Sequence, residues 1–340
     1  MPKALVLGAT GQLGSAAIEH LLQSGWRVTA VTHARPEHLA STVEAIVAGD
    51  QSRAQILKNL GQTFDAVFEP TAYSDADAND LLAASSLYGS IVVVSSCSVY
   101  ADDQGRSLDE ASINGFPQFA APMTEAIATV PPGPETYSTQ KVAMENVFRT
   151  SNMPITILRP CAIYGSNATN PREWWLIKRA LDGRKQTPIA YDGESIFHTS
   201  SAKGIANLVE ICMRNPAQRI LNVADPTPLT ITQIARALEE ATKLQINLHA
   251  FAGEPEGHIG SSPWSAPRPY TIDCSAAKAL GWDGGKEYAV AVKDLTKWLL
   301  SFRDNPHWKE QFKGFANCNE NPFDYAAEDE WLLRHSKAGH

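Results

Sequence analysis

Tyr137 and Lys141 are the two residues whose types and spacing first suggest chemistry. They stand four positions apart in "ETYSTQKVAMENV", residues 135–147, which has the pattern of the first turns of a helix. Positions i and i+4 share one face of a helix, so the lysine can lie beneath the tyrosine. The pair is then a proton donor tuned by a cation; the alternative is an aromatic packing residue that precedes a solvated charge. The motif alone does not decide, because the chain has nine tyrosines.

The chemistry of such a pair is proton transfer to or from an oxygen atom. An ordinary tyrosine hydroxyl has a pKa of about 10, so it gives up its proton poorly near neutral pH. A lysine ammonium about 4 Å away stabilises the phenolate by about 4 kcal/mol at an effective dielectric constant of about 20. That energy corresponds to about three pKa units. Lys141 is therefore expected to lower the pKa of Tyr137 into a range that suits the reduction or oxidation of a carbon–oxygen bond.

A glycine-rich turn lies near the N-terminus. "KALVLGATGQLG" runs from a short apolar strand into three glycines at the head of a helix. Glycines let the backbone approach a pyrophosphate, whose charge the helix N-terminus then stabilises. The spacing is Gly-x-x-Gly-x-x-Gly, not the commoner Gly-x-Gly-x-x-Gly, but it follows the first strand directly. The turn therefore predicts nucleotide binding by Gly8, Thr10, Gly11, Gln12, Leu13 and Gly14.

Short apolar segments alternate with helical patterns through the first half of the chain. "RVTAVTH", "AIVAGD", "DAVFEP", "SIVVVSS" and "ITILRP" are typical of further strands. Continuous apolar strands of this kind indicate a parallel sheet covered by helices on both faces. The predicted fold class is therefore α/β, a Rossmann-type doubly wound parallel sheet with a smaller C-terminal substrate-binding region.

The pattern predicts three regions along the chain. Residues 1–165 form a nucleotide-binding Rossmann domain, and residues 166–301 are mainly a substrate-binding region. A strand near 219–224, "RILNVA", returns to the sheet, and a capping box of Thr230 and Gln233 begins a later amphipathic helix. Residues 302–340 are a C-terminal extension, aromatic enough to pack onto the body.

These motifs occur in a fixed order that resembles a known family. The glycine turn, "VVVSSCSVY" with Ser96 at a strand end, Tyr137-x-x-x-Lys141, Arg159-Pro160 and "IYG" at 163–165 are similar to the extended short-chain dehydrogenase/reductases, the NAD-dependent epimerase/dehydratase family. The resemblance runs from residue 3 to about residue 300. It implies an NAD(P)-dependent oxidoreductase in which a Ser–Tyr–Lys site serves hydride transfer between nicotinamide and a carbonyl or carbinol carbon.

The resemblance also implies roles for individual residues. Tyr137 would pass the proton, Ser96 would hydrogen-bond the substrate oxygen, and Lys141 would hold the nicotinamide ribose as well. Ser98 would share a face with Ser96, because alternate side chains of a strand point the same way. Ala72, in "FEPTAY", would be a backbone contact to the cofactor, although the Glu-Pro before it departs from the family's sequence.

The choice between NADP and NAD depends on the end of the second strand. NAD enzymes place a carboxylate there to bind the adenosine ribose. Here the strand runs into Thr32, His33 and Arg35, and a guanidinium suits a 2′-phosphate. NADP is therefore favoured over NAD, the alternative being that Arg35 is an ordinary loop charge. The resemblance adds adenine contacts from Asp50 and Gln51.

Other departures from the family's sequence reduce the number of reactions that the chain is expected to catalyse. Cys97-Ser98 stands where the family's dehydratases carry an Asp-Glu pair, which argues against the elimination of water. One residue of the Trp174-Trp175 pair is expected in the core, and the other is left as a candidate for the lining of the substrate cleft. A histidine in "FHTSS" and an arginine in "APRPY" each have a structural or surface alternative. The substrate-binding candidates are thus Ser98, Tyr164, Trp174, His198 and Arg268.

Composition excludes several classes of protein. Of the 340 residues 44% are hydrophobic, as in a globular protein with a core. The net charge of −8 argues against nucleic-acid binding. Five scattered cysteines without a Cys-x-x-Cys pair favour neither a disulfide framework nor a metal site, and fit a reducing compartment. With no long apolar segment, we expect no membrane partner and a cytoplasmic location.

Three functions therefore remain open. The first is an NAD(P)-dependent oxidoreductase acting on a small carbonyl, alcohol or sugar-nucleotide substrate. The second is a nucleotide-sugar epimerase that keeps NAD bound throughout its cycle. The third is a non-catalytic NADP-sensing or scaffold protein, which retention of Ser96, Tyr137 and Lys141 together disfavours. The sequence leaves open the substrate and whether the protein is a homodimer.

Overall fold

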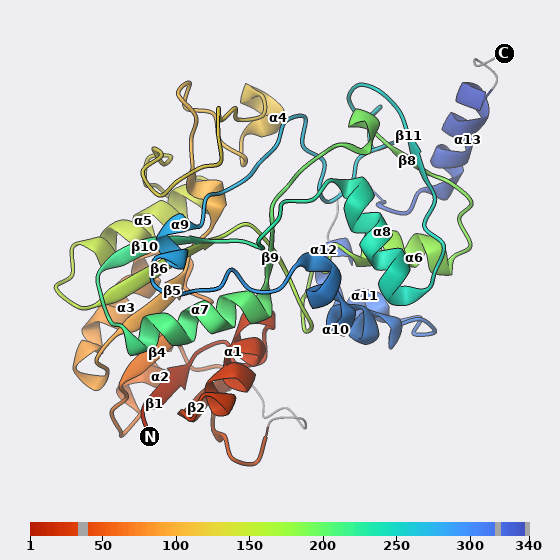
Figure 1. Cartoon of the computed structure of the whole chain (residues 1–340). Helices are drawn as coiled ribbons and strands as arrows, with labels where there is room; N and C mark the ends of the chain where they lie inside the picture. Colours follow the sequence, from red (N-terminus) through yellow and green to blue (C-terminus); the bar gives the residue numbers. More distant parts are fainter. Residues whose placement is uncertain (33–39, 317–320, 337–340) are drawn as a thin grey trace. The chain divides into compact units, whose positions relative to one another are not determined.

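The computed structural model describes residues 1–32, 40–316 and 321–336 (Figure 1). The chain divides into two compact units. The first comprises Met1–Ile163, Ser200–Pro226 and Ile272–Gly285. The second comprises Tyr164–Thr199, Thr227–Thr271 and Lys286–His340. The chain therefore leaves the first unit and returns to it twice.

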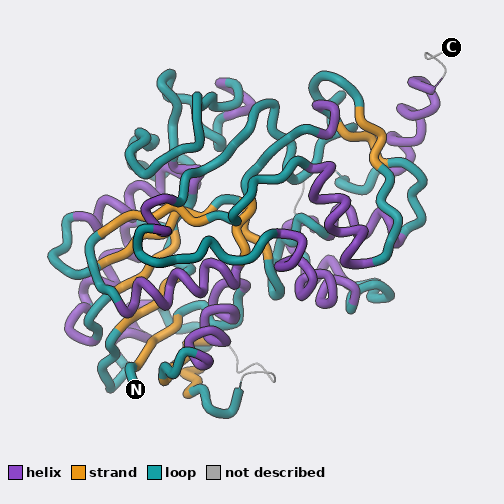
Figure 2. Tube along the Cα trace, in the orientation of Figure 1, coloured by secondary structure: helices purple, strands orange, loops and turns teal. Residues whose placement is uncertain are grey.

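A seven-stranded parallel sheet organises the first unit (Figure 2). Its strand order is β10-β6-β5-β4-β1-β2-β3. Most of these strands are buried along nearly their whole length, as their continuous apolar sequences predict, while β3 at the edge is partly exposed. This architecture confirms the predicted Rossmann-type α/β fold. The strands are β1 (Lys3–Val6), β2 (Arg27–Thr32), β3 (Glu44–Val47), β4 (Ala66–Glu69), β5 (Ile91–Val94), β6 (Ile155–Pro160) and β10 (Arg219–Val223).

Helices cover both faces of this sheet. Helices α1 (Gln12–Gln23) and α7 (Ala202–Arg214) pack together on one face (Figure 1). Helices α3 (Asp75–Ala83) and α5 (Tyr137–Arg149) pack together on the other, with α2 (Arg53–Lys58) beside α3. Met144 and Phe148 of α5 join strand residues such as Ile155 in one apolar core. Packing into this core fixes the position of α5 against the sheet.

Short elements link the main ones of the first unit. A 3-10 turn, η1 (Ser85–Leu87), precedes β5, and another, η2 (Cys97–Val99), follows it. The segment between η2 and α5 is mostly irregular and contains one helical turn, α4 (Ala111–Asn114). Helix α9 (Ser275–Lys278) packs near β10. Two short strands, β7 (Ala162–Tyr164) and β9 (Thr199–Ser201), form a small sheet of their own.

The second unit is built mainly of helices around an aromatic core. Helices α8 (Ile231–Thr242) and α10 (Tyr288–Leu300) pack together, and β8 (Thr187–Ile189) pairs with β11 (Leu248–Ala250). The predicted capping box of Thr230 and Gln233 is present at the start of α8. The remaining elements are α6 (Trp174–Leu181), η3 (Tyr191–Gly193), α11 (Trp308–Gln311), α12 (Lys313–Ala316) and α13 (Tyr325–Ser336).

The described residues of the C-terminal extension belong to the second unit and pack into its aromatic core. Trp308 and Phe312 contact the Trp174 ring, with centroid separations of 5.6 and 5.3 Å. Arg179 of α6 pairs with Glu328 of α13 at 2.7 Å, and both side chains are nearly buried. The extension therefore closes the core of this unit.

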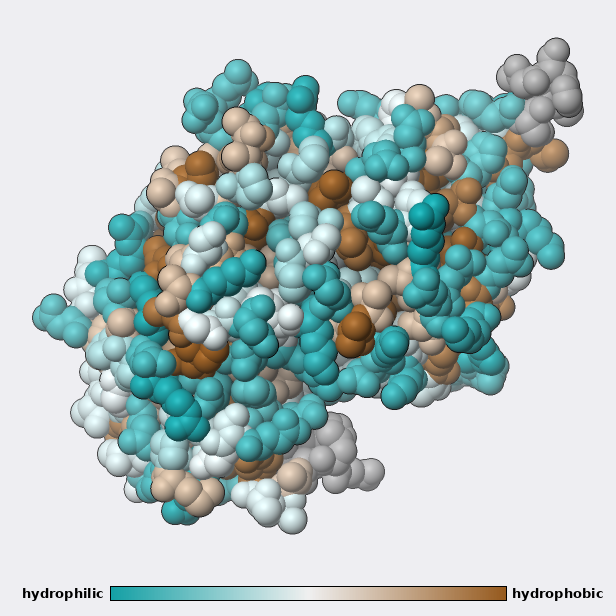
Figure 3. All heavy atoms as spheres, viewed as in Figure 1, coloured by the Kyte–Doolittle hydropathy of each residue, from teal (hydrophilic) through white to brown (hydrophobic). Residues whose placement is uncertain are grey.

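The surface is varied in character. The face drawn in Figure 3 is largely hydrophilic, with apolar residues in small groups. Among the described residues, no helix is both long and apolar enough to cross a membrane.

Candidate active site

The glycine turn between β1 and α1 has the shape of a phosphate cradle. Gly8 has a φ of +59°, which favours glycine, and a Cβ on Gly14 would lie 2.2 Å from the Gly8 carbonyl oxygen. Gly11 caps α1 without a side chain over the first amides, and no acidic residue occupies the first turn. Thr71 packs closely against the turn: a Cβ on Gly8 would lie only 2.4 Å from the Thr71 methyl group, so the position requires glycine. A helix N-terminus that no side chain caps, with its dipole, fits a pyrophosphate.

The end of the neighbouring strand β2 offers a second feature of a nucleotide site. Thr32 is buried, and its hydroxyl has no hydrogen-bond partner within the described part of the chain. A buried polar atom without a partner is costly unless a ligand or water satisfies it. Asp50 and Gln51 follow β3 and are exposed. The predicted contacts His33 and Arg35 lie outside the described residues.

Tyr137 and Ser96 meet at the carboxyl end of the sheet. Thr136 begins α5 with a capping box, so Tyr137 is the first residue of the helix. Ser96 follows β5 and caps η2. Ser96 is close enough to Tyr137 for its hydrogen bonding to lower the pKa of the tyrosine, while 39% of Tyr137 remains exposed. The two hydroxyls predicted from sequence are thus brought together at an accessible position.

Lys141 lies one helical turn beyond Tyr137 and is nearly buried. Its Nζ is 5.6 Å from the centroid of the Tyr137 ring. The ammonium donates hydrogen bonds to the carbonyl oxygens of Ala72 at 2.6 Å and Val94 at 3.0 Å. These carbonyls follow β4 and end β5, so the lysine bridges the two strand ends. Ala72, expected as a cofactor contact, uses its carbonyl oxygen here to hold Lys141.

The pKa of Tyr137 shifts in the direction opposite to the expected one. Burial raises the pKa of Tyr137 to about 12; the hydrogen bond with Ser96 opposes this, and the neighbouring Cys97, Tyr73 and Asp109 groups add to it. The sequence argument considered only attraction between the phenolate and Lys141. In the structure the ammonium is committed to two carbonyls beside the ring. Loss of hydration around the hydroxyl therefore outweighs its field.

The pKa of Lys141 is also displaced, with a consequence for stability. Burial lowers the pKa of Lys141 from 10.5 to about 8, although Glu69, Glu145 and Asp77 act to raise it. Between these two pH values the unfolded chain binds more protons than the folded chain. The free energy of unfolding should therefore rise with pH across this window, by up to about 1.4 kcal/mol per pH unit. Below pH 8 both states hold the proton and the contribution is constant.

We expect the Lys141→Met variant to lack this rise. Urea denaturation at several pH values across the window measures it directly. The exposed Lys58 provides the control, since Lys58→Met should keep the slope of the parent protein. Equal pH slopes in the parent and Lys141→Met would contradict the depressed pKa.

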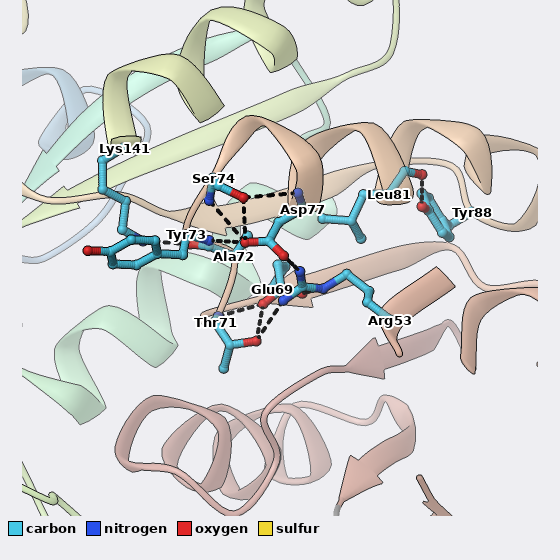
Figure 4. A network of polar contacts seen from close by, with 10 residues as sticks. All are labelled: Arg53, Glu69, Thr71, Ala72, Tyr73, Ser74, Asp77, Leu81, Tyr88 and Lys141. Carbon is cyan, nitrogen blue, oxygen red and sulfur yellow. Dashed lines mark hydrogen bonds and ion pairs between the residues drawn. The ribbon is translucent and has the colours of Figure 1, made fainter. Parts of the chain in front are cut away.

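A partly buried ionic network holds the turn that carries Ala72 (Figure 4). Glu69 is fully buried at the end of β4; it accepts hydrogen bonds from the Thr71 amide and hydroxyl and pairs with Arg53 Nε at 3.1 Å. Arg53 also pairs with Asp77. Asp77 accepts a hydrogen bond from the Tyr73 amide at 2.7 Å and forms the capping box of α3 with Ser74. The network therefore fixes the backbone from residue 69 to residue 74, against which Lys141 is anchored.

Tyr73, which the sequence reasoning missed, lies at this same edge. Its ring centroid is 5.3 Å from that of Tyr137, and 39% of the residue is exposed. Arg53 and Asp77 were missed as well. The unusual Glu69-Pro70 was the only signal, because a carboxylate at a buried strand end requires a partner.

A buried ion pair between α5 and β6 also holds the helix in place. Arg159, at the end of β6, bonds Glu145 through Nε at 3.0 Å and through Nη2, and both side chains are almost wholly buried. Burial lowers the pKa of Arg159, but the hydrogen bond and charge of Glu145 outweigh it and raise the pKa overall. Glu145 lies one turn beyond Lys141, so the pair fixes the helix face that carries the lysine.

The substrate-binding candidates are distributed over both units. Ser98 is buried beside Ser96 in the first unit, whereas Tyr164, His198 and Arg268 belong to the second. Tyr164 is buried with its ring 4.8 Å from that of Tyr288. His198 is buried and donates its backbone amide to the Tyr270 carbonyl at 3.0 Å. Arg268 is exposed.

Neither residue of the Trp174-Trp175 pair is exposed, so the expected core position holds for both. Both are buried, with exposed fractions of 0% and 4%. Trp174 packs between the rings of the C-terminal extension, and the Arg179 guanidinium covers Trp175 at 3.6 Å. The extension covers Trp174, and its position could not be predicted from the sequence pattern. Within the described residues, no group of three His, Cys, Asp or Glu side chains forms a potential metal site.

Comparison with known proteins agrees with this geometry. The model of the NAD dependent epimerase/dehydratase family matches residues 4–224. No curated protein sequence matches significantly.

Solved structures give a further comparison. UDP-glucuronic acid 4-epimerase from Bacillus cereus, in complex with UDP-glucuronic acid and NAD, has a TM-score of 0.65 at 17% identity, covering 88% of this chain and 99% of that one. UDP-N-acetylglucosamine 4-epimerase from Bacillus cereus has a TM-score of 0.64 at 19% identity with the same coverage, 88% and 99%. UDP-glucose 4-epimerase from Thermotoga maritima, with UDP-glucose, has 0.65 at 18% identity, again covering 88% and 99%. At these identities the likeness establishes the fold.

Proposed function

Because the chain belongs to the NAD dependent epimerase/dehydratase family, it is an enzyme that works with a nicotinamide nucleotide, and we propose that it is an NADP-preferring oxidoreductase. Its substrate is a small molecule with a carbonyl group or the corresponding alcohol. The bound nucleotide supplies or accepts the hydride.

Residues of the chain transfer the proton to and from the substrate oxygen and stabilise the charge that develops on it. Tyr137 gives its hydroxyl proton to the substrate oxygen during reduction and takes it back during oxidation. Ser96 donates a hydrogen bond to the same oxygen, which stabilises negative charge that develops there. Lys141 binds the nicotinamide ribose and supplies positive charge. The glycine turn holds the pyrophosphate at the N-terminus of α1.

One observation carries this proposal: the Lys141 ammonium lies 5.6 Å from the ring of Tyr137, beside the strand end where Ser96 caps η2. A tyrosine at the head of a helix has no structural need for a buried lysine and a serine at the adjacent strand end. Burial of the ammonium lowers its pKa, a cost that is common at functional sites.

The preference for NADP rests on the residues after β2. The sequence there offers Arg35 and His33 and no carboxylate for the ribose. We expect Arg35→Ala to weaken NADPH binding about tenfold to a hundredfold, because charge-assisted hydrogen bonds to the 2′-phosphate are lost. NADH binding should stay within about twofold. Quenching of tryptophan fluorescence during titration of each nucleotide measures both constants.

A matched control stands at the other end of the same strand. Arg27 is exposed at the start of β2, so Arg27→Ala should leave both affinities unchanged. An equal loss for NADPH and NADH in Arg35→Ala, or no loss for either, would refute the assignment of Arg35 to the 2′-phosphate.

Sugar-nucleotide 4-epimerisation is a second candidate, favoured by the enzymes that share this fold. Such a reaction oxidises and re-reduces one carbon with the same Tyr137 and Ser96, and the nucleotide stays bound between the two steps. The exposed Arg268 could meet the diphosphate of the substrate. Conversion of UDP-glucuronic acid without added cofactor would favour this candidate over net reduction.

A further inference from the structure

Three serine hydroxyls form a chain that ends at Tyr137. Ser138 Oγ donates to Ser98 Oγ at 2.9 Å, and Ser98 Oγ donates to Ser96 Oγ at 2.9 Å. Ser96 in turn acts on Tyr137, because its hydrogen bonding lowers the pKa of the tyrosine. The chain joins two segments far apart in sequence, the η2 turn after β5 and the first turn of α5.

The chain has a defined direction at Ser96. A serine oxygen can accept two hydrogen bonds and donate one. Ser96 Oγ already accepts from the Ser98 amide at 3.1 Å and from the Ser98 hydroxyl at 2.9 Å. Both acceptor positions are therefore filled. The single O–H of Ser96 is left to donate toward the Tyr137 oxygen.

The far end of the chain is firmly held. Ser138 is fully buried, and its amide donates to Asp109 Oδ2 at 2.7 Å. Ser98 is 8% exposed and lies inside η2. Since neither hydroxyl faces bulk water, each satisfies its hydrogen bonding chiefly through the chain. Donors linked in series also polarise one another.

We propose that Ser98 and Ser138 are positioning residues that hold Ser96 as a hydrogen-bond donor, to the Tyr137 hydroxyl in the free enzyme and to the substrate oxygen once substrate is bound. Such donation favours the phenolate, so it counteracts the effect of burial on Tyr137. The significance for catalysis rests on the proposed function, but the hydrogen-bond geometry does not. Ser98, predicted as a substrate contact, is thereby assigned a different task.

Other groups also face Tyr137 and must stay unchanged in any test. They are Lys141 on α5, Tyr73 after β4, Cys97 in η2 and Asp109 in the segment before α4. None of the serine substitutions below removes a charge. Any change in the titration of Tyr137 therefore comes from hydrogen bonding and not from a lost ion.

The test is a titration of the residue at position 137 that needs no substrate. Full-length protein carrying Tyr137→3-fluorotyrosine gives one fluorine NMR signal, and fluorine lowers the phenol pKa into a range that a folded protein tolerates. Ser96→Ala, Ser98→Ala and Ser138→Ala are each introduced into this background. Ser95→Ala is the matched control, because Ser95 is buried at the same strand end and its hydroxyl has no partner within the described residues.

We expect Ser96→Ala to raise the pKa of the fluorotyrosine by about one unit, the effect of losing a hydrogen bond to a charged oxygen. Ser98→Ala and Ser138→Ala should each raise it by roughly half a unit through lost polarisation. Ser98→Thr, which keeps a hydroxyl, and Ser95→Ala should titrate like the parent.

If Ser98→Ala and Ser138→Ala titrate like the parent while Ser96→Ala shifts, the two serines only pack and the proposal is wrong. If Ser95→Ala shifts as much as they do, the effect is a general loosening of the turn, and the proposal fails too. Nucleotide binding, measured separately on the same proteins, reports on the proposed function. A protein that binds no nicotinamide nucleotide would refute that function and leave the titration result intact.

Discussion

Replacing Tyr137 with phenylalanine is expected to lower kcat/KM about a hundredfold to ten-thousandfold, the usual contribution of a positioned general acid or base. The change removes one hydroxyl and keeps the ring at the head of α5. The affinity for NADPH and the urea midpoint should remain close to those of the parent, because the Lys141 ammonium is anchored on backbone carbonyls and not on the tyrosine. Steady-state kinetics with the substrate in use and fluorescence titration of NADPH measure these quantities.

Tyr73 supplies the matched control for this experiment. Its ring lies 5.3 Å from that of Tyr137, and both residues are 39% exposed. Tyr73→Phe should change kcat/KM by less than about tenfold, since no step requires its proton. If Tyr73→Phe abolished turnover while Tyr137→Phe retained it, Tyr73 would be the general acid or base, and the role assigned to Tyr137 would be refuted.

Replacing Arg159 with methionine should reduce the free energy of unfolding by about 3–5 kcal/mol. The substitution strands the Glu145 carboxylate in a site where its exposed fraction is 2%. Replacing both partners, Arg159→Met with Glu145→Met, removes both charges and should recover most of that loss. Urea denaturation of the two single variants and the double variant tests this as a mutant cycle.

The exposed pair of Lys297 and Asp294 is the control. Its side chains are 80% and 56% exposed, so Lys297→Met should cost less than about 1 kcal/mol. Equal losses at Arg159 and Lys297 would show that burial does not set the cost. If the double variant at Arg159 and Glu145 were no more stable than the single variants, the stranded charge would not explain the loss.

Much of the first unit was predictable because local signals and long-range packing agree there. Apolar segments such as "SIVVVSS" and "ITILRP" became β5 and β6, and the glycine turn lies between β1 and α1. The start of α5 at Tyr137 follows from its capping box, which a local pattern can indicate. The family match over residues 4–224 covers the same part of the chain.

The features that escaped prediction all depend on contacts between distant segments. The network of Arg53, Glu69 and Asp77 joins three elements, and no spacing rule connects them. The burial of Trp174 depends on where the C-terminal extension packs. The pKa of Tyr137 depends on how much water reaches its hydroxyl, which outweighed the charge that the sequence made visible.

The most direct test of the central claim is the identity of the nucleotide that this enzyme holds and prefers. The protein is purified without added cofactor and denatured, and any released nucleotide is identified by mass. NADPH and NADH are then titrated into the folded protein. An NADP-preferring oxidoreductase should arrive without stoichiometric nucleotide and bind NADPH at least about tenfold more tightly than NADH. Release of one NAD per chain, or failure to bind either nucleotide, would contradict the account.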